Sequence, residues 1–452
     1  MLALAVHAAP VSSETRSEDY AGFELPVAVA VANATRRVSE NPENPDNWGH
    51  LGKLLHAHEI LDRAVSAYDK AFELQPENLS WRYLSAIAMQ VKEPRQAIER
   101  MQECIQHELD RPFVHLRLAI ELERAGELDV ARMHYTSALQ SDSRSVHALV
   151  GLSRLDLRAN LWDSAVARLE RARAIAPTHG PLYPLLVQVY RKLNRKDDSR
   201  IAEISTYTYT QALPVPDPIL AEVESLGVSS NALSTRGLKF ASQGRVQEAE
   251  EIFRRVLELR QGQVRDAINL GVTLARQGRL SEAIEVFTQA RGEAPDHAGL
   301  LTNLGQALAE NGSPFEARTV LERAIHLNPH QPKALFNMAN LHIQERRFAE
   351  AIPLLVKALD ANPGMLQARY NLGNAYAAVG KIDNAIQEWE LLAKLRPRDA
   401  NVLFLLGSAY VQKQQLDEAV DRFSKGRDAH PKDGRFQRAL NALSREGKPA
   451  GG

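Results

Sequence analysis

The side chains best placed to do chemistry in this chain are asparagines that recur at a fixed spacing. Four of them share one period, of about 34 residues, and are called the asparagine ladder here: Asn269, Asn303, Asn337 and Asn371. Asn340 and Asn374 each follow a ladder residue by three positions, which places them on the same face of a helix. An asparagine amide offers two hydrogen-bond donors and an acceptor. A regular row of amides can therefore bind the backbone of an extended peptide without requiring a particular sequence.

Aromatic residues lie directly beside the asparagine ladder. Phe336 and Tyr370 each precede a ladder residue, and Phe404 has the same place one period later. These rings can contact the apolar side chains of a bound peptide. The period continues to Thr235 on one side and Leu405 on the other, so the ladder is confined to the middle of the pattern.

A structural role is the alternative explanation for the asparagine ladder. Asparagine is a mediocre residue inside a helix, so four at one phase require a reason. Hydrogen bonds to neighbouring helices, which would fix the spacing of the repeats, supply one, and peptide binding supplies another. The sequence leaves both open.

Other chemistry finds little support. His56 and His58 are two positions apart and fall on different helix faces, while Pro329 interrupts the region of His326 and His330. There is no phosphate-binding glycine loop, no haem-attachment motif and no paired carboxylates suited to acid–base catalysis. The single cysteine, Cys104, excludes an intrachain disulfide and is expected in the core. We therefore expect no catalytic residues, no metal and no cofactor, and no enzyme activity.

A second series of regularly spaced residues, all alanines, indicates which structural elements position the asparagines. Its members are Ala64, Ala97, Ala131, Ala165, Ala249, Ala283, Ala317, Ala351, Ala385 and Ala419. The six in the second half keep the period of the asparagine ladder without exception, and the four in the first half depart from it by one position at a single step. A repeated pair of helices requires the same small side chain at each close crossing. This period therefore predicts a repeat architecture.

Other residues return in phase with these alanines. The copy at 264–297 contains Leu270, Gly271, Gly278, Ala283, Phe287, Ala290 and Pro295. The copy at 45–78 contains Trp48, Leu51, Gly52, Ala64, Tyr68, Ala71 and Pro76. Glycine is suited to a left-handed turn between the two helices, and proline stops the second helix.

This pattern resembles the tetratricopeptide repeat, a unit of about 34 residues. The resemblance covers roughly 30–203 and 230–433, about ten copies. It implies an all-α solenoid, a right-handed superhelix of antiparallel helix pairs whose first helices line a concave groove. In that family the position of the asparagine ladder faces the groove, and the ladder is similar to the one in the tetratricopeptide superhelix of O-GlcNAc transferase.

The domain organisation follows from where the repeat breaks. The stretch 204–229 contains Pro214, Pro216 and Pro218 and is expected to be a semi-rigid connector, with a short helix at 219–226. It separates an N-terminal array at 27–203, whose last copy is degenerate, from six regular repeats at 230–433. A capping helix is expected at 434–446. Residues 1–26 are expected to be disordered or processed, and 447–452 to be a disordered tail.

One tetratricopeptide binding mode can be tested directly against the sequence. The dicarboxylate clamp that binds chaperone C-termini combines asparagines with lysine and arginine on adjacent helices. Asn340 and Asn371 could serve as its asparagines, but Phe336 stands where the clamp needs lysine. Asn401 and Leu405 stand where it needs lysine and arginine. The sequence argues against a chaperone clamp.

Composition and charge bear on the classes of partner that the protein can bind, but they do not decide its cellular location. The formal net charge is −1, which gives no electrostatic case for nucleic acid. No apolar run reaches the roughly 18 residues that a membrane-spanning helix needs. Residues 1–10 are apolar but lack a basic start, so they make a poor export signal. A cytoplasmic and a bacterial periplasmic location both stay open.

Three functions remain. The first is a non-catalytic scaffold that binds an extended peptide or partner segment in the groove of 264–399. The second is an accessory subunit that docks through convex or end surfaces. The third is a regulatory partner of a separate enzyme such as a glycosyltransferase. Fold alone does not decide among them.

Overall fold

The computed structural model describes residues 23–260 and 263–446. Within these ranges the chain forms 25 α-helices and no strand, so the all-α prediction is confirmed. The predicted segments 1–26 and 447–452 lie wholly or largely outside the described residues. None of the described helices combines the length and the apolar character needed to cross a membrane.

The helices group into two compact units. The first unit, residues 1–177 and 213–261, contains α1 (Leu25–Glu40), α2 (Pro45–Ala57), α3 (Leu61–Leu74), α4 (Leu79–Met89), α5 (Pro94–Gln106), α6 (Pro112–Ala125), α7 (Leu128–Ser141), α8 (Val146–Arg158), α9 (Trp162–Ile175), α12 (Pro218–Ser225), α13 (Ser230–Ser242) and α14 (Val246–Leu259).

The second unit, residues 178–212 and 262–452, contains α10 (Leu182–Lys192), α11 (Lys196–Thr208), α15 (Val264–Arg276), α16 (Leu280–Glu293), α17 (Ala298–Glu310), α18 (Pro314–Leu327), α19 (Pro332–Gln344), α20 (Phe348–Ala361), α21 (Leu366–Ala378), α22 (Ile382–Leu395), α23 (Ala400–Gln412), α24 (Leu416–Ala429) and α25 (Gly434–Glu446).

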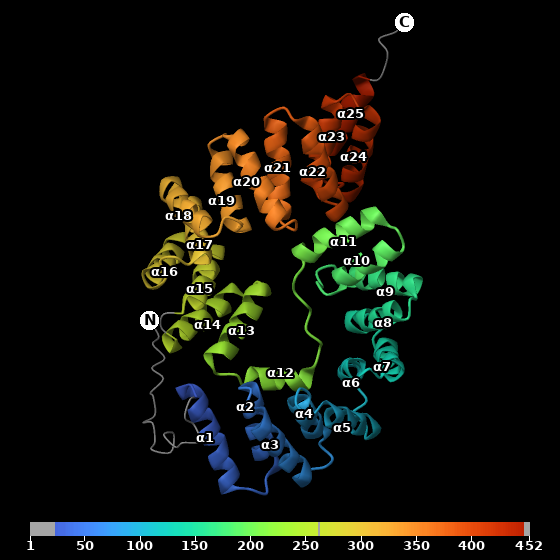
Figure 1. The fold of residues 1–452 in the computed structure, drawn as a ribbon, viewed down its shortest axis with the longest axis vertical. Coiled ribbons are helices and arrows are strands. Elements are labelled where there is room, and N and C mark those ends of the chain that lie inside the picture. The colour runs from blue at the N-terminus through green and yellow to red at the C-terminus, as the bar shows by residue number, and fades with distance from the viewer. Residues whose placement is uncertain (1–22, 261–262, 447–452) are drawn as a thin grey trace. The chain divides into compact units, whose positions relative to one another are not determined.

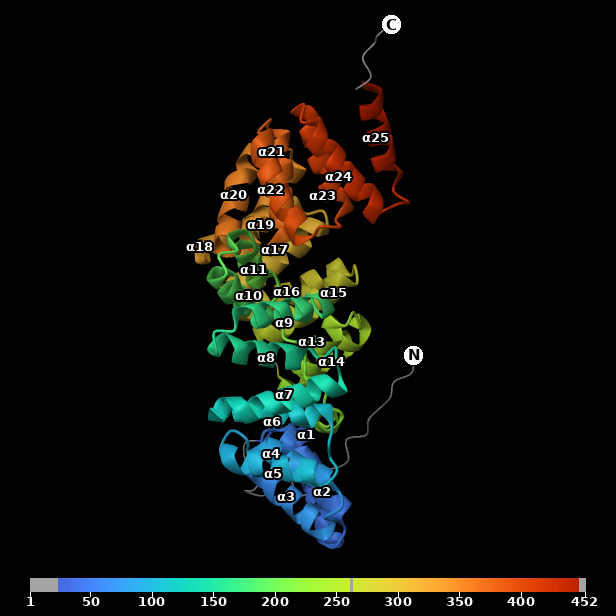
Figure 2. The same ribbon diagram turned by 90° about the vertical axis from the view of Figure 1, so that its right-hand side faces the viewer.

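Most helices pair with the next helix in the chain, and within each unit consecutive pairs such as α2–α3 and α4–α5, or α17–α18 and α19–α20, pack on one another. Figure 2 shows this stacking clearly for α6, α7, α8 and α9. The first helix of each pair is called its A helix and the second its B helix. Because every pair buries its apolar faces against its neighbours, each unit is a solenoid and needs no single central core.

The tight turn between A and B helices uses the left-handed backbone conformation, as the glycine pattern predicts. Gly278 and Gly312 have φ of 77° and 83°. The same turn position is taken without glycine by Arg346, with φ of 60°, and by Gln414, with φ of 59°. The repeat therefore fixes the turn geometry even where the side chain disfavours it.

All ten alanines of the repeat are fully buried. The glycine of each Leu-Gly pair has a related role. A Cβ atom built on Gly271 would lie 2.3 Å from the Phe287 ring, and one on Gly373 would lie 2.4 Å from Trp389 Nε1. The A helix therefore rests directly on the large ring of the B helix. Trp48 is half-buried, and its Nε1 donates to Pro42 O at 2.7 Å.

The two units divide the chain at places other than the predicted ends of the two arrays. The helix pair α13–α14 belongs to the first unit, where Glu24 accepts a hydrogen bond from Ser230 N at 2.7 Å and pairs with Arg260 at 3.3 Å. The degenerate pair α10–α11 belongs to the second unit. There α11 packs on α22, and Thr208 Oγ1 donates to Gly364 O at 3.3 Å. These contacts are long-range, and repeat phase alone does not predict them.

The connector contains the short helix that the sequence predicts. Residues 209–217 are not helical, and α12 occupies Pro218–Ser225. At the other end of the chain α25 spans Gly434–Glu446, the range expected for a capping helix. Its Phe436 is fully buried beside Gly426 of α24. The apolar side of α24 is thus covered.

Candidate functional site

The A helices α15, α17, α19 and α21 carry the asparagine ladder at one position each. In the second unit α17 lies beside both α15 and α19 (Figure 1), so successive ladder residues come from adjacent helices. Asn269, Asn303 and Asn371 are half-buried, while Asn337 is only 8% exposed. The ladder therefore lies where helices meet, with three of its amides still partly accessible.

Asn337 is unusual among these amides. Its Nδ2 is buried and has no hydrogen-bond partner among the described residues. A buried donor without a partner costs roughly 1–3 kcal/mol. Native proteins leave few such groups, and each one calls for an explanation.

The other amides of this region are partly engaged. Asn371 Nδ2 donates to Asn340 Oδ1 of the preceding A helix at 2.8 Å, and Asn371 Oδ1 accepts from Gln367 at 3.0 Å. Asn303 Nδ2 donates to Gly299 O of its own helix at 2.7 Å. The bond between Asn340 and Asn371 has the form that the structural explanation requires. Asn303, by contrast, is tied only to its own helix.

The two remaining asparagines make no hydrogen bond through their side chains to any residue in the described ranges. They are Asn269 on α15 and Asn374 on α21, and both are half-buried. Each keeps two donors and an acceptor. Each of the six predicted amides therefore keeps at least one N–H that bonds to no residue in the described ranges.

The three predicted aromatic residues are all half-buried, but they have different neighbours. Phe336 and Tyr370 lie at the edges of apolar clusters formed by their own and adjacent repeats. Phe404 packs against Phe423 and Phe436, with ring centroids 5.6 and 5.9 Å away. Phe404 therefore helps to pack α25 against its neighbours, whereas Phe336 and Tyr370 lie only partly buried beside their clusters.

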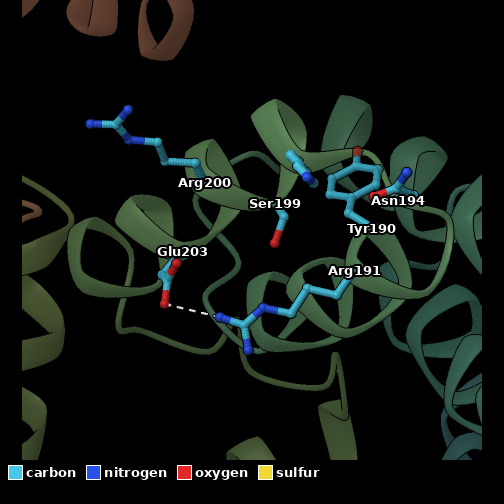
Figure 3. Close-up of a pocket in the computed structure, with 7 residues that line it drawn as sticks. Tyr190, Arg191, Asn194, Ser199, Arg200 and Glu203 are labelled. Atoms are coloured by element: carbon cyan, nitrogen blue, oxygen red, sulfur yellow. Dashed lines mark hydrogen bonds and ion pairs between the residues drawn. The ribbon is translucent and has the colours of Figure 1, made fainter.

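A hollow that the sequence did not predict lies between α10 and α11 and encloses about 330 Å³. Figure 3 shows its lining residues: Tyr190, Arg191, Asn194, Lys196, Ser199, Arg200 and Glu203. Arg191 pairs with Glu203 at 3.1 Å, and the Arg195 guanidinium stacks over the Tyr190 ring. The lining is basic, but the Arg191–Glu203 ion pair joins α10 to α11 and so serves the packing of this pair.

Several charged residues that sequence reasoning did not single out are buried in the first unit. Glu123 accepts hydrogen bonds from Arg154 at 2.7 Å and from Tyr135 at 2.9 Å. Burial raises the pKa of Glu123, but these hydrogen bonds and the Arg154 charge outweigh it and hold the pKa below its usual value. Asp156 pairs with Arg132 at 2.7 Å and also with Arg168. These pairs join consecutive repeats and stabilise the packing.

The histidines and the cysteine remain poor candidates for chemistry. In the described part of the chain, no group of three or more histidine, cysteine, aspartate or glutamate side chains is arranged to bind a metal. Cys104 is fully buried, and burial raises the pKa of its thiol to about 12. His115 bridges His134 at 2.8 Å and Asp110 at 2.6 Å, which joins α6 to α7.

Comparison with known proteins identifies the repeat family that this architecture matches. Models of the tetratricopeptide repeat match residues 122–189, 274–335, 336–400 and 370–434, which together make just over half of the chain. A curated relative, the inactive TPR repeat-containing thioredoxin TTL3 of Arabidopsis thaliana, is 27% identical over 174 residues. That match spans 36% of this chain and only 25% of the relative.

Solved structures with a similar course of the chain include MamA from MSR-1, which is 28% identical and covers 37% of this chain and 95% of its own, with a TM-score of 0.33. PilF of Pseudomonas aeruginosa is 20% identical and covers 48% and 97%, with a TM-score of 0.42. YrrB, described as a TPR protein with an unusual peptide-binding site, is 20% identical and covers 42% and 97%, with a TM-score of 0.36. From the repeat models, the chain belongs to the tetratricopeptide-repeat family, whose members bind proteins or peptides and are typically non-catalytic.

Proposed function

We propose that this protein is a non-catalytic scaffold and that the A helices α15, α17, α19 and α21 bind an extended segment of a partner protein. The buried, unpartnered Nδ2 of Asn337 carries the proposal. A purely structural amide would be expected to have found a partner within the fold. A rotation of the Asn337 side chain toward a bound backbone carbonyl would satisfy this N–H and remove its cost.

The neighbouring side chains support the same assignment. Asn269, Asn303 and Asn374 retain donors and acceptors, and Phe336 and Tyr370 offer half-buried apolar surface beside them. Amides that bond to a peptide backbone provide affinity without sequence preference, and the rings provide pockets for alternate side chains. The partner would then be recognised mainly as an extended chain.

One contact favours a second role for part of the ladder. The hydrogen bond from Asn371 to Asn340 links α21 to α19 at 2.8 Å. We assign this pair a structural contribution as well, and Asn303 and Asn337 the larger share of peptide binding. The accessory-subunit alternative needs none of these amides, because docking through B helices or chain ends does not involve them.

Affinity capture from the source lysate tests the proposal. The variant Asn303→Ala/Asn337→Ala/Asn371→Ala is compared with wild type and with a matched control, Gln289→Ala/Glu322→Ala/Lys357→Ala, which alters exposed residues of α16, α18 and α20. All three proteins are first shown to fold equally. We expect a partner that wild type and control capture and the asparagine variant loses. A partner held equally by all three proteins would place the binding surface elsewhere and favour the accessory-subunit role.

A further inference from the structure

The connector of the first unit lies against A helices, where a ligand of a tetratricopeptide array would lie. The connector segment is defined here as residues 213–228. Along its length it contacts four A helices in reverse chain order. Their contacting residues are His147 of α8, Arg117 of α6, Tyr83 of α4 and Lys53 of α2. Figure 1 shows its helix, α12, beside α2 and α4.

The polar contacts of the connector segment centre on one buried carboxylate. The side chain of Asp217 is only 2% exposed. It accepts a hydrogen bond from Tyr83 Oη at 2.6 Å and lies 3.5 Å from Arg117 Nε. Its other oxygen accepts from Leu220 N at 3.0 Å and so caps α12. A buried carboxylate is tolerated only with such partners, so the array supplies a specific site for it.

Further contacts extend the interaction on both sides of Asp217. His147 Nε2 lies 2.9 Å from Leu213 O, and Lys53 pairs with Glu222. Val223 is 2% exposed, and Ile219 and Leu220 pack against the apolar clusters of both the α1–α4 and the α4–α8 regions. The array thus binds a backbone carbonyl, two carboxylates and one apolar helix face.

The helix within the segment owes its order to this surface. It has eight residues, and isolated helices shorter than about 12 residues are marginal in water. Residues 209–217 before it are not helical. The connector segment therefore has the properties of a short peptide that becomes ordered on binding.

We infer that the A helices α2, α4, α6 and α8 form a second peptide-docking surface, which the connector segment fills as an internal ligand. An external partner of this surface would share the features of the connector segment. It would carry an aspartate that caps a short helix, and that helix would have acidic residues on one side and branched apolar residues on the other. The charge of the surface agrees with this, because Lys53 and Arg117 face the carboxylates of the segment. The inference does not depend on the site proposed for the second unit.

An external partner would compete with the connector segment for this surface, and the connector segment has the advantage of being tethered to it. A segment joined to its own site acts at an effective concentration on the order of millimolar. An external segment of equal intrinsic affinity would therefore bind the wild-type chain only weakly. Weakening the internal contacts should expose the surface and raise the apparent affinity for the external segment.

A peptide with the sequence of residues 211–228, labelled for fluorescence anisotropy, tests this on the full chain. The opened variant is Asp217→Asn/Val223→Ser. The matched control is Asp129→Asn/Val91→Ser, which makes the same changes at exposed positions. We expect the opened variant to bind the peptide at least tenfold more tightly than wild type and control. A peptide with Asp217→Asn should bind the opened variant at least tenfold more weakly. Equal affinities in all cases would overturn the inference.

A second measurement does not require the opened variant to fold. The same peptide, with a photo-crosslinking residue in place of Ile219, is added to the wild-type chain at about 1 mM, comparable to the expected effective concentration. We expect crosslinks to α2 and α4, near Lys53 and Tyr83, that are lost with the unlabelled peptide in excess. Crosslinks confined to other helices, or none, would show that the connector segment is only a structural filler.

Discussion

Replacing Asn337 by leucine should stabilise the protein. Asn337 is 8% exposed, and its Nδ2 has no partner in the described structure. Removing a buried unsatisfied donor recovers roughly 1–3 kcal/mol. Leucine has the same branching and the same number of side-chain heavy atoms as asparagine, and the last repeat already carries Leu405 at the same position. We therefore expect Asn337→Leu to raise the local free energy of unfolding by about 1–3 kcal/mol while it weakens peptide binding.

Hydrogen exchange of the backbone amides in α17, α19 and α21 is the suitable assay, because repeat arrays can unfold in parts and exchange reports the local free energy of opening. Asn371→Leu serves as the comparison. It removes the 2.8 Å bond to Asn340 and the 3.0 Å bond from Gln367, so it should lower local stability by about 0.5–1.5 kcal/mol. We therefore predict changes of opposite sign in the local free energy of unfolding, a gain for Asn337→Leu and a loss for Asn371→Leu.

A loss of stability in Asn337→Leu of about 1 kcal/mol or more would refute the reasoning, because that is the size of a net hydrogen bond within the fold. It would mean that the Asn337 amide makes such a bond and that its role is structural. The stability gain predicted here, coupled with a loss of binding, is the usual signature of a residue retained for function.

Three further predictions concern single residues. The Cys104 thiol, with its pKa raised to about 12 by burial, should react with a thiol reagent at pH 8 only after denaturation, and rapid labelling of the native chain would contradict its burial. Burial lowers the pKa of His56 to about 4, below the usual 6.5, so its contribution to stability is present above pH 6.5 and is lost as the pH falls toward 4. An NMR titration midpoint for His56 near 6.5 would disprove this. Arg346→Gly should raise the free energy of unfolding by about 0.5–1 kcal/mol, because Arg346 has φ of 60° at an exposed turn. An unchanged or lower midpoint of thermal unfolding would show that the Arg346 side chain makes a compensating contact.

The repeat architecture could be predicted from the sequence because it depends on local, recurring requirements. Ala317 and its counterparts must be small where helices cross, and Gly278 must adopt a positive φ. Both requirements return once in every repeat, so a single chain shows them many times. The short helix at 218–225 was also predictable, since the prolines before it prevent an earlier start.

The long-range contacts could not be predicted in the same way. Asp217 lies 134 residues from Tyr83 in the chain, and no period relates them. Thr208 and Gly364 are 156 residues apart. Such contacts decide that the connector lies against the first array and that α10–α11 pack with the second unit. The chemistry of the asparagine ladder was visible in the sequence, but the burial of Asn337 and the bond between Asn340 and Asn371 depend on how neighbouring helices pack.

Site-specific photo-crosslinking tests the central claim most directly. A benzophenone amino acid is placed at Phe336, beside the asparagine ladder, or at the exposed Lys357 of the B helix α20, and each protein is irradiated in the source lysate. We predict that one partner segment is crosslinked from position 336, not from 357, and that adding Asn303→Ala/Asn337→Ala abolishes this crosslink. Capture from position 357 alone, or capture from position 336 that survives the asparagine changes, would contradict it.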